Sequence, residues 1–172
     1  MTKQVKSKQR VADHGEVFTA EREVKAMCDL VKQETERIDS RFLEPACGDG
    51  NFLAEILARK LAVVTKKYKI SAFDWERYSL LALGSIYGVD ILADNAVACP
   101  ERLFAIWNKV YKNICKKECT EETRISAKFI LSRNIVCGNA LTLMCVDENQ
   151  IDNGIPIVFS EWTMPFNNEN MQ

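Results

Sequence analysis

A glycine-containing loop between a predicted strand and a predicted helix constrains the fold of this chain more than any other feature. In residues 41–52, Arg41 is followed by the apolar pair Phe42-Leu43 and an acid at Glu44, and the chain then turns through Gly48-Asp49-Gly50 before helical spacing starts. In open α/β sheets, ligands bind at the carboxyl ends of strands. Glycines let a ligand approach the backbone, and the first N–H groups of a helix attract anions. The loop therefore predicts a ligand site, although an ordinary strand-to-helix turn would use the same residues.

Two common phosphate-binding loops and several protein classes do not fit this sequence. A dinucleotide fingerprint needs a third glycine where Leu53 stands, and no Gly-Lys-Ser/Thr follows as a P-loop requires. The 172 residues predict about one domain, and 47% hydrophobic residues exclude a disordered chain. With 23 basic and 24 acidic residues the net charge is −1, which excludes a free-standing nucleic-acid binder held by bulk electrostatics.

Helical and strand patterns alternate around the loop. Apolar spacing predicts helices over residues 20–37, from residue 51, and over 103–114 and 125–131, with strands at 42–43, 85–90, 134–138 and 155–159. Asp74 is a predicted N-cap within an extra helical excursion over residues 62–84, and Trp107 and Tyr111 are predicted core residues. Pro156 places the last strand's start or an edge there. The pattern predicts a mostly parallel sheet with helices on both faces.

Seven cysteines follow no metal-binding or secretory pattern. The N-terminus lacks a signal peptide, and no apolar stretch approaches transmembrane length. Cys115 and Cys119 lie on a predicted helix, but His14 is the only histidine, and structural zinc normally needs four ligands. We expect a reduced, cytoplasmic chain without a metal or membrane segment, in which buried thiols pack as small hydrophobic groups.

A second acid stands at the end of the next predicted strand. Asp90 closes the run 85–90, where a carboxylate in such folds accepts hydrogen bonds from both ribose hydroxyls of an adenosine. Ile91 could then lie against the adenine. Asp90 could instead cap the helix that follows.

These segments together resemble the adenine-specific (N6) DNA methyltransferases of restriction–modification systems. Residues 44–52 resemble motif I, residues 14–20 the N-terminal motif, residues 87–91 motif II and residues 138–141 motif III, in the family's order over residues 14–160. The resemblance implies a Rossmann-like S-adenosylmethionine-dependent methyltransferase fold, truncated after the fourth strand. It divides the chain into a basic flexible arm (1–13), an S-adenosylmethionine-binding domain (14–160) and a tail or catalytic-loop remnant (161–172).

The resemblance also assigns roles residue by residue. Phe18 and Thr19 would contact the methionine part, the loop would cradle its amino and carboxylate groups, and Asp90 would hold the ribose. Asn139 stands where the family usually has Asp, and its amide oxygen is a weaker, uncharged acceptor for the adenine amino group. The implied cofactor-binding residues are Phe18, Thr19, Glu44, Pro45, Ala46, Gly48, Asp49, Gly50, Asn51, Phe52, Asp90, Ile91, Asn139 and Ala140.

The family's catalytic motif, Asp/Asn/Ser-Pro-Pro-Tyr/Phe, is not recognisable here. In the family it positions the target amine and stacks on a flipped base. Either Ser160 takes the first position with Trp162 as the stacking ring, or Thr163-Met164-Pro165-Phe166 is a degenerate copy. The segment could also be a strand end and a tail. The catalytic candidates are therefore Ser160, Trp162, Pro165 and Phe166.

Three functions remain open. The chain could be the cofactor-binding portion of a DNA adenine methyltransferase that meets DNA with another segment or a specificity subunit. It could be a degenerate, non-catalytic S-adenosylmethionine-binding module. It could methylate a substrate other than DNA, because a cofactor loop does not select the substrate.

Overall fold

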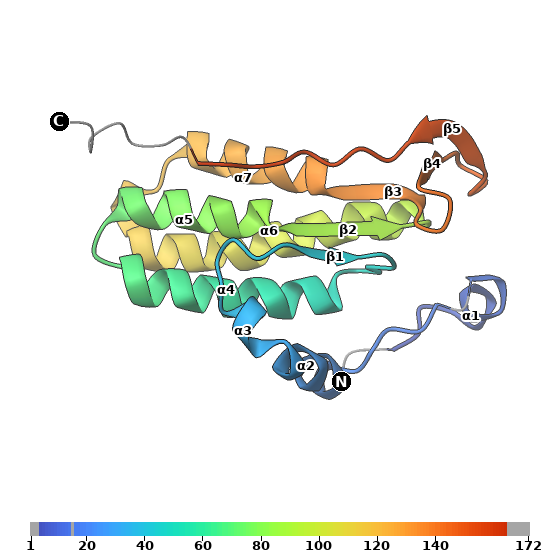
Figure 1. Cartoon of the computed structure of the whole chain (residues 1–172), viewed down its shortest axis with the longest axis horizontal. Helices are drawn as coiled ribbons and strands as arrows, with labels where there is room; N and C mark the ends of the chain where they lie inside the picture. Colours follow the sequence, from blue (N-terminus) through green and yellow to red (C-terminus); the bar gives the residue numbers. More distant parts are fainter. Residues whose placement is uncertain (1–3, 15, 165–172) are drawn as a thin grey trace.

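The computed structural model describes residues 4–14 and 16–164 as an α/β fold (Figure 1). In chain order, the elements are α1 (Lys8–His14), α2 (Glu21–Leu30), α3 (Lys32–Thr35), β1 (Phe42–Glu44), α4 (Asn51–Tyr68), α5 (Ala72–Gly84), β2 (Ile86–Asp90), α6 (Ala93–Cys115), the 3₁₀ turn η1 (Lys116–Glu118), α7 (Glu121–Asn134), β3 (Ile135–Asn139), β4 (Met144–Val146) and β5 (Asp152–Pro156).

The strands form one mixed sheet in the order β1-β2-β3-β4-β5. The first three strands are parallel, with Leu43 opposite Tyr87 and Val89 opposite Val136. The last two pair antiparallel. The carboxyl ends of β1, β2 and β3 therefore meet at one edge of the sheet, which is where the sequence predicted a ligand site.

The core lies between the parallel strands and the long helices. Leu103, Trp107 and Tyr111 are fully buried at i, i+4 and i+8 of α6, and Tyr111 stacks on Trp75 with ring centroids 5.7 Å apart. The Trp107 indole donates to Ser79 Oγ at 3.0 Å, so its polar edge is satisfied inside the core. The prediction that Trp107 and Tyr111 are core residues is confirmed.

A buried lysine holds the chain segment that precedes β1. Lys60 of α4 is 0% exposed, and its ammonium donates to the carbonyl oxygens of Arg37, Ile38 and Ser40 at 2.7, 3.0 and 2.7 Å. All three donors are thereby used. Burial lowers the pKa of Lys60 to about 8. The side chain ties the segment before β1 to α4 and so helps to set the position of that strand.

The crossover helices do not lie on both faces of the sheet, contrary to expectation. Both α4 and α6 contact β2 and pack against each other, which places them on the same face. Each crossover advances by one strand in the same direction, as right-handed connections on a single face require. Figure 1 shows α5 in line with β2 and α7 in line with β3, so the predicted helical excursion over residues 62–84 extends beyond the strands.

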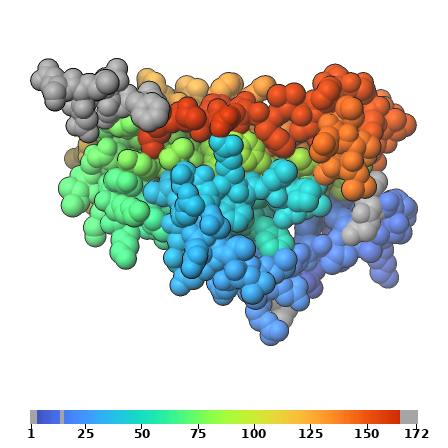
Figure 2. Space-filling view, viewed as in Figure 1, coloured from blue at the N-terminus to red at the C-terminus, as the bar shows by residue number. Residues whose placement is uncertain are grey.

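Residues after β5 cover part of the opposite face. The Phe159 ring meets Tyr87 edge-on at 5.2 Å, and the Tyr87 hydroxyl donates to the Ser160 carbonyl at 2.8 Å. Figure 2 shows this segment, in red, as a strip along the surface.

The predicted fourth parallel strand at residues 155–159 is wrong. Residues 152–156 form β5, which pairs antiparallel with the unpredicted β4. Pro156 ends this strand instead of starting it, but β5 is an edge strand of the described sheet, as the alternative expectation for Pro156 required. Residues 157–164 are not a strand. Pro156 has no N–H for a ladder, so it suits a strand end.

Three helix boundaries also differ from expectation. The predicted helix over residues 20–37 divides at Val31. Val24 and Cys28 of its predicted apolar face are buried, whereas Met27 and Val31 are half-exposed. Ser71, not Asp74, caps α5, and its Oγ accepts from the Asp74 N–H at 3.2 Å. Helix α7 begins four residues earlier than predicted, because Thr120 caps it.

Within the described part of the chain, every helix is too short or too polar to span a bilayer.

Candidate cofactor-binding site

The loop between β1 and α4 is a tight turn that leans on β2. Gly48 and Gly50 have φ of 54° and 94°, which other L-residues rarely adopt. The Cys47 N–H donates to the Val89 carbonyl and the Gly50 N–H to the Cys47 carbonyl, both at 2.9 Å. The two glycines predicted from the sequence are therefore required by the turn itself.

Protein side chains, and not an open space, approach both glycines. A Cβ on Gly50 would lie 2.9 Å from Cys99 Sγ, and one on Gly48 would lie 2.9 Å from the Phe18 ring. A hydrogen bond with the Cys99 thiol and burial both raise the pKa of Cys47. This thiol stays protonated and packs as a small hydrophobic group.

Asp90 joins the end of β2 to the loop. Its Oδ2 accepts from the Gly48 N–H at 2.8 Å, and its Oδ1 accepts from the Leu92 N–H at 2.9 Å and from Asn95 Nδ2 at 3.1 Å. A carboxylate has about four acceptor sites. Three are used, so this arrangement leaves room for one further hydrogen bond, whereas the predicted grip on both ribose hydroxyls needs two.

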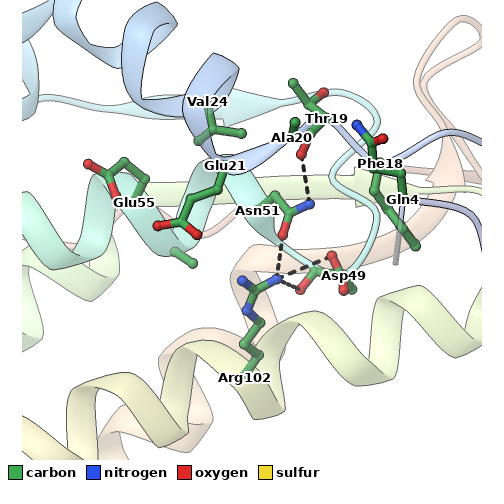
Figure 3. A pocket seen from close by; sticks show the side chains of 11 residues that line it. Gln4, Phe18, Thr19, Ala20, Glu21, Val24, Asp49, Asn51, Glu55 and Arg102 are labelled. Carbon is green, nitrogen blue, oxygen red and sulfur yellow. Dashed lines mark hydrogen bonds and ion pairs between the residues drawn. The ribbon is translucent and has the colours of Figure 1, made fainter. Parts of the chain in front are cut away.

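A cavity of about 450 Å³ opens beside the loop (Figure 3). Phe18 and Thr19 line one side, and Asp49 and Asn51 line another, so four predicted cofactor-binding residues meet there. Arg102 of α6 spans the floor: its Nη1 donates to Asn51 Oδ1 at 2.7 Å and to Asp49 Oδ1 at 3.2 Å. Ligand pockets are typically about 300–1,000 Å³, so the volume suits a small-molecule ligand.

Helix α4 begins at this cavity, and the partial positive charge of its first N–H groups is not neutralised by a side chain. Gly50 supplies no side-chain cap, and the first turn holds no acidic residue. The N–H groups at the start of an 18-residue helix are thus available to an anionic group.

The remaining loop residues have different surroundings. Burial raises the pKa of Glu44, whose carboxylate accepts from the Ala46 N–H at 3.3 Å. Pro45 is exposed. Phe52 packs against the hydrophobic core and lines a separate apolar groove beside Leu43, so its side chain is not at the main cavity.

The end of β3 carries a polar turn. Asn139 Oδ1 accepts from the Leu141 N–H at 3.0 Å and from the Thr142 N–H at 3.4 Å, so the expected adenine acceptor is engaged in its own turn. Ala140 and Ile91 are both partly exposed near the carboxyl ends of β3 and β2. The parallel strands bring Asn139, Asp90 and Glu44 to one edge of the sheet.

The described part of the N-terminal segment, where the sequence predicts a basic flexible arm over residues 1–13, is partly helical and contacts the start of α6. Arg10 forms ion pairs with Glu16 and with Asp94, the latter at 2.8 Å, and the Lys6 ammonium donates to Asn95 Oδ1. The hydrogen bonds from Arg10 lower the pKa of both Glu16 and Asp94. Figure 1 shows α1 on the same side as the carboxyl ends of the parallel strands.

The catalytic candidates are not brought to the cavity. The Trp162 indole N–H donates to Asn134 Oδ1 at 2.7 Å. Trp162 also packs closely on Gly84, because a Cβ added at Gly84 would lie 2.9 Å from the Trp162 Cβ. Asn134 immediately precedes β3, and Gly84 stands two residues before β2, so Trp162 lies at the amino ends of these strands. The Ser160 carbonyl contacts Tyr87, the second residue of β2. Pro165 and Phe166 lie outside the described residues.

Three residues of α6 that are not among the predicted site residues contact the site. Asn95 donates to Asp90, Cys99 packs on Gly50, and Arg102 binds the loop. They stand at i, i+4 and i+7, which is one face of a helix. The sequence signal that could have identified them is this helical spacing of polar and apolar residues in the helix that follows the strand ending in Asp90.

Comparisons with known proteins assign the chain to no family, and its described residues contain no metal centre. Across residues 4–13 and 16–164, Cys, Asp and Glu side chains form no group of three suited to a metal ion. The chain matches no protein-family model, no curated protein and no solved structure.

Proposed function

We propose that this chain binds S-adenosylmethionine at the β1–α4 loop and serves as the cofactor-binding portion of a DNA adenine-N6 methyltransferase of a restriction–modification system. The observation that carries the proposal is the connection of the loop to Asp90. The Gly48 N–H donates to Asp90 Oδ2 at 2.8 Å. Asp49, the residue after Gly48, lines a cavity of about 450 Å³ together with Phe18 and Thr19, although Gly48 and Asp90 are not among the residues that line it. An acidic residue at the next strand's end, joined to a glycine turn, suits a nucleoside ligand.

The residues at the cavity fit the chemistry of this cofactor. Its amino-acid end carries a carboxylate, which suits the uncapped start of α4, and an ammonium group, which suits Asp49. Its ribose would need the one remaining acceptor site of Asp90 or a shift of Asn95. When bound, the cofactor supplies a methyl group activated by positive sulfur. The chain's own residues would bind it and hold its orientation.

Base recognition and positioning of the target amine are assigned, within the proposal, to another segment or a specificity subunit. Two observations support this. Ser160 and Trp162 contact residues at or near the amino ends of the strands, away from the cavity. Strand β1 pairs only with β2 in the part of the chain that the structure describes, which leaves its other edge able to accept a further strand.

A non-catalytic cofactor-binding module is the second candidate. The same placement of Trp162 favours it, because an aromatic held by Asn134 and packed on Gly84 cannot stack on a base at the opposite end of the sheet. A substrate other than DNA is a third possibility that no contact in the fold favours.

Ligand-induced thermal stabilisation tests the cofactor assignment. We expect S-adenosylmethionine and S-adenosylhomocysteine to raise the melting temperature, and NAD and ATP to leave it unchanged, because the loop lacks the dinucleotide and P-loop patterns. Equal stabilisation by ATP would contradict the assignment. Transfer of a radiolabelled methyl group to unmethylated duplex DNA, with and without neighbouring gene products, then separates a methyltransferase portion from a non-catalytic module.

A further inference from the structure

Among the described residues, Arg102 is the one basic side chain that lines the cavity, and it keeps unused donors. Its three hydrogen bonds, to the Asp49 carbonyl, Asp49 Oδ1 and Asn51 Oδ1, all come from Nη1. Over residues 4–14 and 16–164, its Nε and Nη2 donate to no protein atom. A guanidinium has five N–H donors in a planar fork, so three or more of them remain free in a side chain that is 38% exposed.

The other charged side chains of the cavity already have partners. Glu21 pairs with Lys25 at 2.7 Å, and Glu55 pairs with Arg59 at 2.9 Å. Figure 3 shows Arg102 reaching from α6 toward Asp49 and Asn51, with Phe18 and Thr19 on the other side of the cavity. A ligand that enters the cavity therefore meets one positive group with free donors.

We propose that Arg102 binds the carboxylate of the ligand's amino-acid end. The inference rests on the proposed function and adds a binding residue to it. A planar fork of N–H donors matches a carboxylate and forms two parallel hydrogen bonds with it. The contacts of Nη1 with Asp49 and Asn51 hold the guanidinium in place before the ligand arrives, which lowers the entropy cost of binding.

A comparison of two ligands isolates this contact. Decarboxylated S-adenosylmethionine lacks the carboxylate and is otherwise identical to S-adenosylmethionine. Calorimetry would measure the affinity of both ligands for the native chain and for Arg102→Gln. We expect the native chain to prefer S-adenosylmethionine about tenfold, which corresponds to about 1.4 kcal/mol. Arg102→Gln should remove most of that preference, and Arg102→Lys should keep part of it.

The ratio of the two affinities separates ligand binding from a purely structural role. If Arg102 only held the loop, its loss would lower the affinity for both ligands equally. The variant would then keep the native preference for S-adenosylmethionine. That result, or a native chain without a preference, would overturn the inference while leaving the proposed function intact. Failure of the native chain to bind either ligand would overturn both.

Two controls keep the test interpretable. Arg133→Gln removes an exposed arginine of α7, next to the amino end of β3, and should leave both affinities unchanged. Circular dichroism and thermal unfolding would establish that Arg102→Gln is folded. If it is not, Arg102→Lys carries the comparison, since it keeps a charge at the loop but not the fork.

Discussion

Replacing Asp90 by alanine should destabilise the chain strongly, because it leaves three donors without their acceptor. The Leu92 N–H and Asn95 Nδ2 are buried, and the Gly48 N–H is partly buried. An unsatisfied buried donor costs about 1–3 kcal/mol, so the two buried donors alone cost about 2–6 kcal/mol. Asp90→Asn should fall between the native chain and Asp90→Ala, because it keeps one acceptor oxygen.

Urea unfolding followed by tryptophan fluorescence measures this loss, since Trp75 and Trp107 are fully buried. Asp147→Ala is the matched control. Asp147 Oδ1 also accepts two backbone N–H groups, from Asn149 at 2.8 Å and from Ile151 at 3.0 Å, but it is exposed and water can replace it. Its loss should cost about 0.5 kcal/mol or less. Equal costs for the two variants would refute the account of Asp90.

Two further predictions concern buried or paired charges. Burial lowers the pKa of Lys60 to about 8, so between pH 8 and 10.5 the unfolded chain binds more protons there than the folded chain. The urea-measured stability of the native chain relative to Lys60→Met should therefore rise by up to about 3 kcal/mol across that window, and a gap that stays constant with pH would contradict this. The hydrogen bond from Arg10 lowers the pKa of Glu16, so its contribution is present above pH 4.5 and lost as the pH falls below it. Glu16→Gln should increase hydrogen exchange in residues 4–14 and 16–18 at pH 7, and the increase should shrink progressively as the pH falls below 4.5.

The elements with strong local signals could be predicted from the sequence. The buried stripe of α6 repeats at helical spacing, and the turn around Gly50 needs backbone angles that glycine adopts, so both follow from local chemistry. The first three strands and their common edge were also predicted, because strands that alternate with helices form parallel sheets.

The features that depend on distant partners could not be predicted. Strand β4 has three residues and exists because it pairs with β5, and the path of residues 157–164 is set by contacts with Tyr87 and Asn134. The sequence pattern of the basic N-terminal segment predicts a solvated arm, because it does not show that Arg10 pairs with Glu16 and Asp94. Local patterns contain none of these pairings.

A calorimetric titration of S-adenosylmethionine into the native chain tests the central claim most directly. The account predicts saturable binding at one site, retained in Asp147→Ala and weakened in Asp90→Ala, because Asp90 holds the loop against β2. Absence of saturable binding to the native chain would contradict the account.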